Sequence, residues 1–286
     1  MRLKIIFNIY TMISLNEKNY KLYYLDTCVL SEMVKDRSGF GSDLLNIVLE
    51  DGIIAVALNS IWELKSAPIV YRDVIDVISV LPTVILKNEE MIFEEEYKLF
   101  NDSTHSLSPI MACFSSTLFK NYGIDILKTF EEKVTDDKNE MVKKERNKTF
   151  EILGKMPSKI FSRGELKTIS SVESSVELSA FILATNYIMS ELQEYMKGER
   201  EFPIKNFPSL MSTSYALHYK YLQAERKGSV SDIEDILMSA LYPYVDVVVT
   251  ERNQCNIIRQ IQKRHGYFEG LETLNMEQVK KHKNKR

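Results

Sequence analysis

Acidic residues recur where an apolar run of the sequence ends or a helical pattern begins. Asp26 follows the run LYYL, Glu63 stands in NSIWEL just after IIAVAL, and Glu251 closes the run VDVVVT. Asp232 and Asp235 lie three residues apart in SDIED. Carboxylate oxygens are the ligands that Mg²⁺ and Mn²⁺ prefer, and such ions can activate a water molecule and stabilise a leaving oxygen. These residues are therefore candidates for a metal site that acts on phosphodiesters.

Each of these residues also has a structural interpretation. Asp26 is placed to cap the helix that follows it, and Glu251 to start the last long helix. Ser60 with Glu63 has the S-x-x-E spacing of a capping box, in which two side chains satisfy the first backbone N–H groups of a helix. Taken singly, each acid is better explained by a structural role such as capping than by metal binding.

The acidic pair in SDIED gives a stronger functional signal. Ser231 with Glu234 has the capping-box spacing, which assigns Glu234 to capping and places Asp232 and Asp235 in the first turns of a helix. Residues three apart share a helix face, and two like charges so placed repel unless a positive group lies between them. We therefore expect a cation beside this pair.

Residues so far apart in sequence can meet only if the fold brings the ends of several strands to the same edge of a sheet. Apolar, partly β-branched runs predict strands at Leu22–Leu25, Ile53–Leu58, Val80–Leu86 and Val245–Thr250. Helical patterns follow at Thr27–Lys35, Ile61–Lys65, Glu89–Tyr97 and Arg252–Lys263. This alternation predicts an α/β fold with a mostly parallel sheet covered by helices on both faces, whose strand ends share one edge.

The middle of the sequence has a different pattern. Strand signals are absent between about Asn101 and Pro208, and helical patterns occupy Lys128–Leu153, Val172–Tyr195 and Phe207–Lys227. We interpret residues 101–207 as a helical insertion that divides the α/β domain into two parts, 1–100 and 208–286.

Composition favours a soluble protein of a reducing compartment. The 286 residues are 44% hydrophobic and 27% charged, with a net charge of −3, so any basic surface must be local. The three cysteines are far apart and lack zinc-ligand spacing. The apolar run Leu3–Leu15 faintly resembles a signal peptide, but no small-residue cleavage site follows it. We predict a cytoplasmic location and no membrane partner.

Three segments, in this order, resemble the motifs of PIN-domain nucleases: LDTCVLSEM, NSIWELK and SDIEDILMSALYPYVDVVVTERN. The resemblance implies a PIN-like fold, dependence on Mg²⁺ or Mn²⁺, and endonuclease activity, in many members on RNA and often as a toxin with an inhibitory protein partner. It implies that Asp26, Glu63 and Asp235 bind metal, that Glu251 is the fourth ligand and Asp232 an accessory catalytic acid, and that Thr27 and Thr250 orient carboxylates or water.

The sequence departs from the family pattern in three places. The fourth acid usually stands two residues after the threonine, where this chain has Arg252, and Cys28 replaces a common asparagine. The helical middle has no counterpart in a minimal PIN domain. A catalytically degenerate protein that binds RNA or another protein is therefore the alternative, and DNA is an alternative substrate. No interface signature indicates an oligomeric state.

Basic residues near the acidic segments are candidates for nucleic-acid contact. Lys220, Arg226 and Lys227 follow several tyrosines in one helical pattern, and Arg252 opens the last long helix. Basic and aromatic side chains together can hold phosphate and stack bases. The alternative is an amphipathic helix whose basic end matches its C-terminal dipole.

Overall fold

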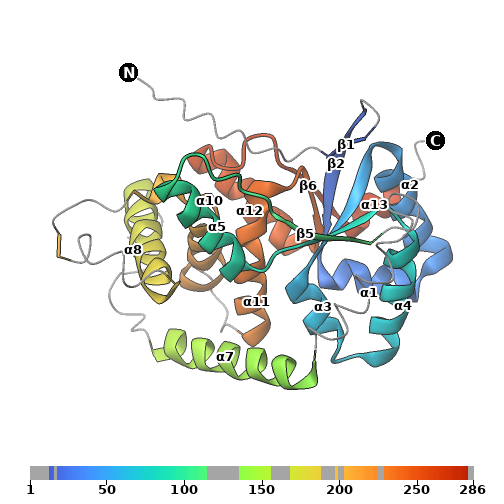
Figure 1. Cartoon of the computed structure of the whole chain (residues 1–286), viewed down its shortest axis with the longest axis horizontal. Coiled ribbons are helices and arrows are strands. Elements are labelled where there is room, and N and C mark those ends of the chain that lie inside the picture. Colours follow the sequence, from blue (N-terminus) through green and yellow to red (C-terminus); the bar gives the residue numbers. More distant parts are fainter. Residues whose placement is uncertain are drawn as a thin grey trace.

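The computed structural model describes residues 13–15, 18–114, 135–155, 168–187, 197–198, 203–223 and 229–282. The fold is α/β, with a central, mostly parallel sheet between helices (Figure 1). The strands lie in the order β5-β4-β3-β2-β6-β7, and β1 pairs with β2 outside this path. Their bounds are β1 Ile13–Leu15, β2 Lys18–Leu25, β3 Gly52–Ala57, β4 Thr83–Leu86, β5 Ile110–Phe114, β6 Val247–Thr250 and β7 Glu272–Asn275.

The chain reverses its direction across the sheet at β2. From β2 it adds β3 and then β4 on one side, and it later returns to place β6 and β7 on the other. These five strands are parallel, whereas β5 runs antiparallel to β4 and β1 antiparallel to β2. Ligands of open parallel sheets bind outside the carboxyl ends of the strands at such a reversal. A ligand-binding site is therefore expected at the carboxyl ends of β2 and β6.

Side chains of the central strands alternate between two cores, as the two-residue period of a strand requires. Leu22 and Tyr24 belong to one buried cluster, and Tyr23 and Leu25 to the other. The same alternation holds along β3 and β6. Both faces of the sheet are therefore buried, which explains why these strands are almost wholly apolar.

The core that contains Tyr23 is covered by helices from the first hundred residues and from the C-terminal end. They are α1 Thr27–Lys35, η1 Arg37–Gly41, α2 Ser42–Asp51, α3 Leu58–Leu64, α4 Pro68–Val80 and α13 Met276–His282.

The core that contains Tyr24 is covered by helices from the middle and later parts of the chain. They are α5 Glu89–Asn101, α8 Ile169–Tyr187, η3 Ile204–Asn206, α10 Pro208–Leu217, η4 His218–Leu222, η5 Ser239–Tyr244 and α12 Arg252–His265, with Met238 of α11 Val230–Met238. Val172 and Val176 of α8 lie in the same buried cluster as Tyr24, so this helix shares the core of the sheet.

Most sequence-based elements of the α/β part are confirmed to within a few residues. The predicted helix Thr27–Lys35 matches α1, and the four predicted strands correspond to β2, β3, β4 and β6. Pro82 lies just before β4, as a strand boundary. It does not mark an edge strand, because β5 pairs with β4. The sequence analysis did not predict α2, α4 or β7.

The expectation that residues 101–207 contain no strand is wrong. β5 lies within this range and extends the sheet beyond β4. Its short sequence, IMACF, has no alternation of polar and apolar residues, so it could not be distinguished from a loop or a buried helix segment. The predicted helices at Lys128–Leu153 and Val172–Tyr195 correspond to α7 Asp136–Lys155 and α8 where the structure describes them.

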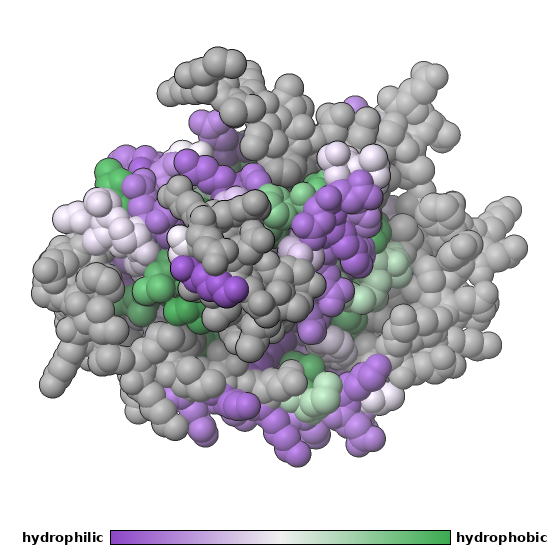
Figure 2. All heavy atoms as spheres, turned by 60° about the vertical axis from the view of Figure 1, so that its left-hand side comes forward, coloured by the Kyte–Doolittle hydropathy of each residue, from purple (hydrophilic) through white to green (hydrophobic). Residues whose placement is uncertain are grey.

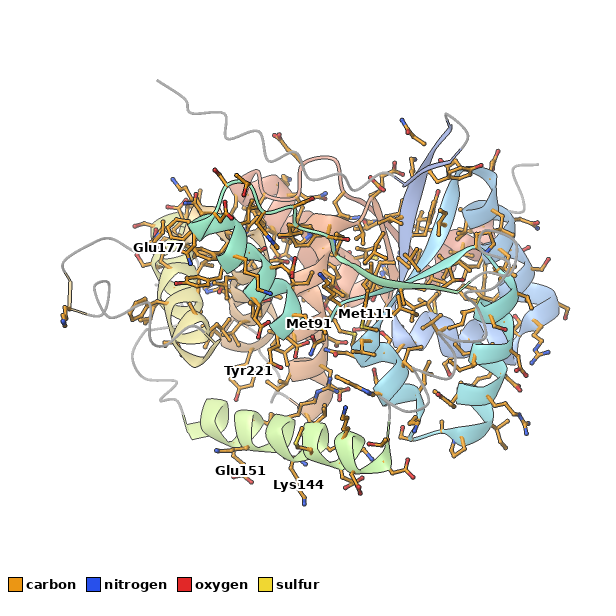
Figure 3. All side chains as sticks on the ribbon, viewed as in Figure 1. Met91, Met111, Lys144, Glu151, Glu177 and Tyr221 are labelled. Carbon is orange, nitrogen blue, oxygen red and sulfur yellow. The ribbon has the colours of Figure 1, made fainter. Side chains whose placement is uncertain are left out.

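Helix α7 runs along one side of the molecule, next to α3 and α11 (Figure 1). Its Lys144 and Glu151 point away from the rest of the chain (Figure 3). Figure 2 shows a face on which hydrophilic residues predominate among the coloured atoms, with smaller hydrophobic areas between them. Across the described ranges, every helix is too short or too polar to cross a membrane.

Candidate acidic site

Asp26 occupies the turn between β2 and α1, at the point where the chain reverses across the sheet. Its backbone N–H donates to the carbonyl of Val249 at 3.1 Å, which joins the end of β2 to β6. Its side chain caps α1, because Oδ1 accepts from the N–H of Thr27 at 2.7 Å. Oδ2 accepts from the hydroxyl of Thr250 at 2.5 Å. The carboxylate is only 7% exposed and is held from two elements, so the side chain that caps α1 also has a fixed orientation.

Glu63 lies in α3, the helix that directly follows β3, and β3 is the strand that pairs with β2. Burial raises the pKa of Glu63 to about 7; proximity to Thr27 lowers it, and the charges of Glu234, Asp26 and Asp235 raise it further. The capping box predicted for Ser60 and Glu63 is wrong, since α3 begins after Ala57 without a side-chain cap. The Glu63 carboxyl therefore does not cap α3 and lies near other acids. A nearby cation would stabilise its charged form.

Asp235 lies in α11 and accepts a hydrogen bond from a buried lysine, Lys220. Burial raises the pKa of Asp235 to about 7 and the charge of Asp26 adds to the rise, whereas the charge of Lys220 and its hydrogen bond to Asp235 lower it. The Lys220 ammonium donates to Oδ2 of Asp235 and lies 3.8 Å from Oδ1 of Asp232. A positive group therefore does lie beside the acidic pair, as the sequence analysis expected, and it comes from the protein itself.

The capping of α11 differs from the prediction. Ser229, not Ser231, is the N-cap, and Asp232 is its capping partner: Oδ2 of Asp232 accepts from the N–H of Ser229 at 2.7 Å. Glu234 instead forms an ion pair with Arg146 of α7. The assignment of Glu234 to capping is therefore wrong. Asp232 is 2% exposed; one carboxylate oxygen caps α11 and the other lies near the Lys220 ammonium. Asp232 therefore holds other residues of the site in position.

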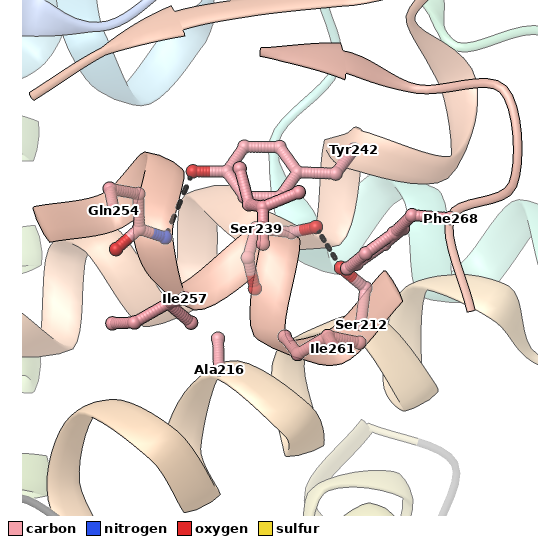
Figure 4. A pocket seen from close by; sticks show the side chains of 9 residues that line it. Ser212, Ala216, Ser239, Tyr242, Gln254, Ile257, Ile261 and Phe268 are labelled. Carbon is pink, nitrogen blue, oxygen red and sulfur yellow. Dashed lines mark hydrogen bonds between the residues drawn. The ribbon is translucent and has the colours of Figure 1, made fainter. Parts of the chain in front are cut away.

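Gln254 was missed by sequence reasoning and completes the surroundings of Lys220. Its Oε1 accepts from the Lys220 ammonium at 3.3 Å, and its Nε2 donates to the hydroxyl of Tyr242 at 3.1 Å (Figure 4). These two bonds fix the orientation of the amide. Gln254 and Tyr242 line a tightly packed, mostly apolar region with Ile257, Ile261 and Phe268. The one signal in the sequence is the position of Gln254 in the first turn after a strand end.

The remaining predicted residues take three different positions. Glu251 is exposed at the start of α12 without capping it, and its charge raises the pKa of Asp235, so it lies near the acids. Arg252 is exposed beside it. Lys220 is 2% exposed and engaged by carboxylates, so the prediction that it contacts nucleic acid is wrong. Arg226 and Lys227 lie outside the described residues.

Helix α7 bridges two of the elements that carry the acids. Arg146 is buried and pairs with Glu234 of α11. At the start of the helix, Asp136 lies 3.6 Å from the ammonium of Lys65, the residue directly after α3. Since Glu234 also influences the pKa of Glu63, Arg146 contributes to the electrostatics of the site as well as to the anchoring of α7.

The donor chemistry of the site fits Mg²⁺ or Mn²⁺. Asp26, Glu63 and Asp235 supply carboxylates from three elements, and the hydroxyl oxygen of Thr27 is buried with no hydrogen-bond partner of good geometry. One of these carboxylates, that of Asp235, already binds a cation, the Lys220 ammonium. Within the described parts of the chain, however, no three His, Cys, Asp or Glu side chains are arranged to enclose an ion. Binding would require the carboxylates to draw together.

Comparison with known proteins identifies no relative. No protein-family model matches the chain, and neither the curated proteins nor the solved structures contain a significant match.

Proposed function

We propose that this protein is a metal-dependent endonuclease with a PIN-like fold, in which Asp26, Glu63 and Asp235 hold Mg²⁺ or Mn²⁺. The observation that carries the proposal is the electrostatic coupling of these three acids. Each comes from a different element, and both Glu63 and Asp235 have a raised pKa to which the charge of Asp26 contributes. Perturbed carboxyl groups that share a sheet edge are typical of functional sites.

The bound ion would supply Lewis-acid activation of water and stabilise the leaving oxygen. The protein's residues have separate roles. Thr250 and the N–H of Thr27 fix the Asp26 carboxylate in one orientation. Glu251, exposed at the rim, is the candidate fourth ligand, and Arg252 beside it is placed to contact a phosphate. Asp232 holds the start of α11 and thereby positions Asp235.

The resemblance in sequence extends the proposal to the substrate and a partner. RNA is the preferred substrate on that ground, and an inhibitory protein that covers the exposed rim is the expected partner. Cleavage of labelled single-stranded RNA and DNA of mixed sequence, with Mn²⁺, Mg²⁺ or EDTA, tests the proposal.

The variants for this assay are Asp26→Asn and Glu63→Gln, with Glu272→Gln as the control. Glu272 is an exposed acid at the first residue of β7, the opposite end of the parallel strands. We expect metal-dependent cleavage by the wild type and by Glu272→Gln, and none by the two site variants. Equal cleavage by all four proteins would reject the site.

A second candidate function is a binding module without catalysis. It is favoured by the buried ammonium of Lys220, which already neutralises part of the acidic cluster, and by the absence of a ready ion-binding group in the described ranges. This candidate predicts that RNA binding persists in EDTA and that no cleavage occurs with either metal. Fluorescence anisotropy with labelled RNA, measured in EDTA and in Mn²⁺, separates the two functions.

A further inference from the structure

A lysine, Lys220, is buried among the acids of the site. Lys220 lies in η4, a wider helical turn that continues α10. Such turns often occur at functional sites, because they redirect side chains from the regular helix positions. His218 in the same turn bonds through Nδ1 to the hydroxyl of Ser175 in α8 at 3.1 Å, which holds η4 in place. The position of Lys220 is therefore fixed by packing.

The surroundings of Lys220 are those of a bound cation. Its ammonium contacts Asp235 and Gln254, with Asp232 at 3.8 Å, and 2% of the residue is exposed. A lysine is rarely buried unless it is paired, because removing its charge from water is costly. Here two carboxylates and one amide oxygen satisfy it. Oxygen ligands of this kind are also those of a divalent metal ion.

We propose that Lys220 is a built-in competitor of the metal ion for Asp235. While the ammonium holds Asp235, that carboxylate is shared between Lys220 and the ion, so Asp235 binds the ion less tightly than it would without the lysine. The inference rests on the proposed function only in taking a divalent ion as the ligand. Removal of the lysine frees Asp235 and removes a positive charge from beside the site, so both effects increase metal affinity.

Calorimetric titration of the full chain with MnCl₂ tests this competition. We expect Lys220→Met to bind Mn²⁺ with an affinity at least about tenfold higher than that of the wild type. The control is Lys263→Met, an exposed lysine toward the far end of α12, which should bind as the wild type does. In Lys220→Met/Asp235→Asn the gain should disappear, because the carboxylate that the lysine releases is absent, and Asp235→Asn alone should bind Mn²⁺ more weakly than the wild type.

Thermal unfolding provides a second readout, because Lys220→Met leaves Asp232 and Asp235 without their cation. We expect its midpoint to fall in EDTA and to rise with Mn²⁺ by more than that of the wild type. A folded Lys220→Met with unchanged or weaker Mn²⁺ affinity overturns the proposal. A Lys220→Met that stays unfolded in saturating Mn²⁺ overturns it too, since the ion then does not substitute for the ammonium.

The two proposals fail in different ways. If the wild type binds no Mn²⁺ and cleaves nothing while Lys220→Met binds the ion, the competition stands and the nuclease function is rejected. If the wild type binds Mn²⁺ and cleaves RNA while Lys220→Met binds no more tightly, the nuclease stands and the competition is rejected.

Discussion

The hydroxyl of Thr250 donates a hydrogen bond of 2.5 Å to Oδ2 of Asp26, across 224 residues of sequence. Thr250 is the last residue of β6, and Asp26 directly follows β2, so the bond joins the two strands between which the chain reverses across the sheet. It is buried and leaves the carboxylate one orientation. The edge of the sheet thus positions the central acid before any ligand arrives.

Thr250→Val should therefore weaken metal binding without unfolding the protein. Valine keeps the shape and removes the donor, so the Asp26 carboxylate loses one of three hydrogen bonds, the others coming from the N–H of Thr27 and the thiol of Cys28. Loss of a residue that orients a ligand lowers metal affinity by about 10–100-fold. Calorimetric titration with Mn²⁺ measures this change. Thr83→Val is the matched control, because Thr83 is equally buried, lies at the opposite end of β4, and makes no side-chain hydrogen bond through its hydroxyl.

Arg146→Met should loosen α7. The substitution breaks the ion pair with Glu234 and leaves that carboxylate in a largely buried position, at a cost of about 1–3 kcal/mol. We expect faster amide hydrogen exchange across α7, with exchange in β2 and β6 unchanged. Lys143→Met, which removes an exposed pair within the same helix, should exchange like the wild type. Unchanged protection of α7 in Arg146→Met would show that the ion pair does not anchor the helix.

Glu96 should make stability depend on pH. It is 2% exposed and accepts from the N–H of Ser209 and the hydroxyl of Tyr244. Burial raises the pKa of Glu96 from 4.5 to about 7, and these hydrogen bonds oppose the rise. The folded protein therefore binds this proton more tightly than the unfolded chain. The stabilisation is present in full below pH 4.5 and is lost as the pH rises through about 7.

Glu96→Gln tests this dependence, because glutamine keeps an acceptor oxygen and cannot ionise. Relative to the wild type, we expect the variant to gain about 3 kcal/mol of stability as the pH rises through this interval. Urea unfolding of both proteins at several pH values measures the difference. A constant difference between the two proteins at all pH values would contradict the prediction, whatever its size, since the other titrating acids are common to both.

Gly52→Ala should destabilise the start of β3. A Cβ at this position would lie 2.3 Å from the ring of Tyr23 and 2.9 Å from the carbonyl oxygen of Lys21, in the neighbouring strand. Relief requires the ring to move out of a packed core, which costs about 1–3 kcal/mol. Urea unfolding should show a lower midpoint. Combination with Tyr23→Leu should recover part of the loss, and strict additivity of the two changes would argue against the steric cause.

The α/β part of the fold could be predicted because its signals are local. Strands buried on both faces are continuous apolar runs, and an acidic residue directly follows two of them, Asp26 after β2 and Glu251 after β6. β5 and β7 carried no such signal: one is short and uniformly apolar, and the other, ETLN, is an edge strand with polar residues. Their positions depend on pairing with β4 and β6, which sequence periodicity does not report.

The acids of the site could be proposed from sequence, but their partners could not. Choosing between Ser229 and Ser231 as the cap of α11 depends on where the helix begins, to within two residues. The pairing of Lys220 with Asp235 depends on the wider turn η4, which breaks the regular helix spacing. Local patterns therefore identified the charged residues of the site but not which of them pair. Lys220, predicted to contact nucleic acid, is instead paired with Asp235.

The packing of α8 against the sheet determines how the chain unfolds. Val172 and Val176 are buried in one cluster with Tyr24 of the central strand. Because the helical middle and the sheet share these contacts, neither loses them without the other, and the described parts gain their stability cooperatively. Excision of α8 to obtain a minimal α/β domain would open the core of the sheet rather than trim its surface.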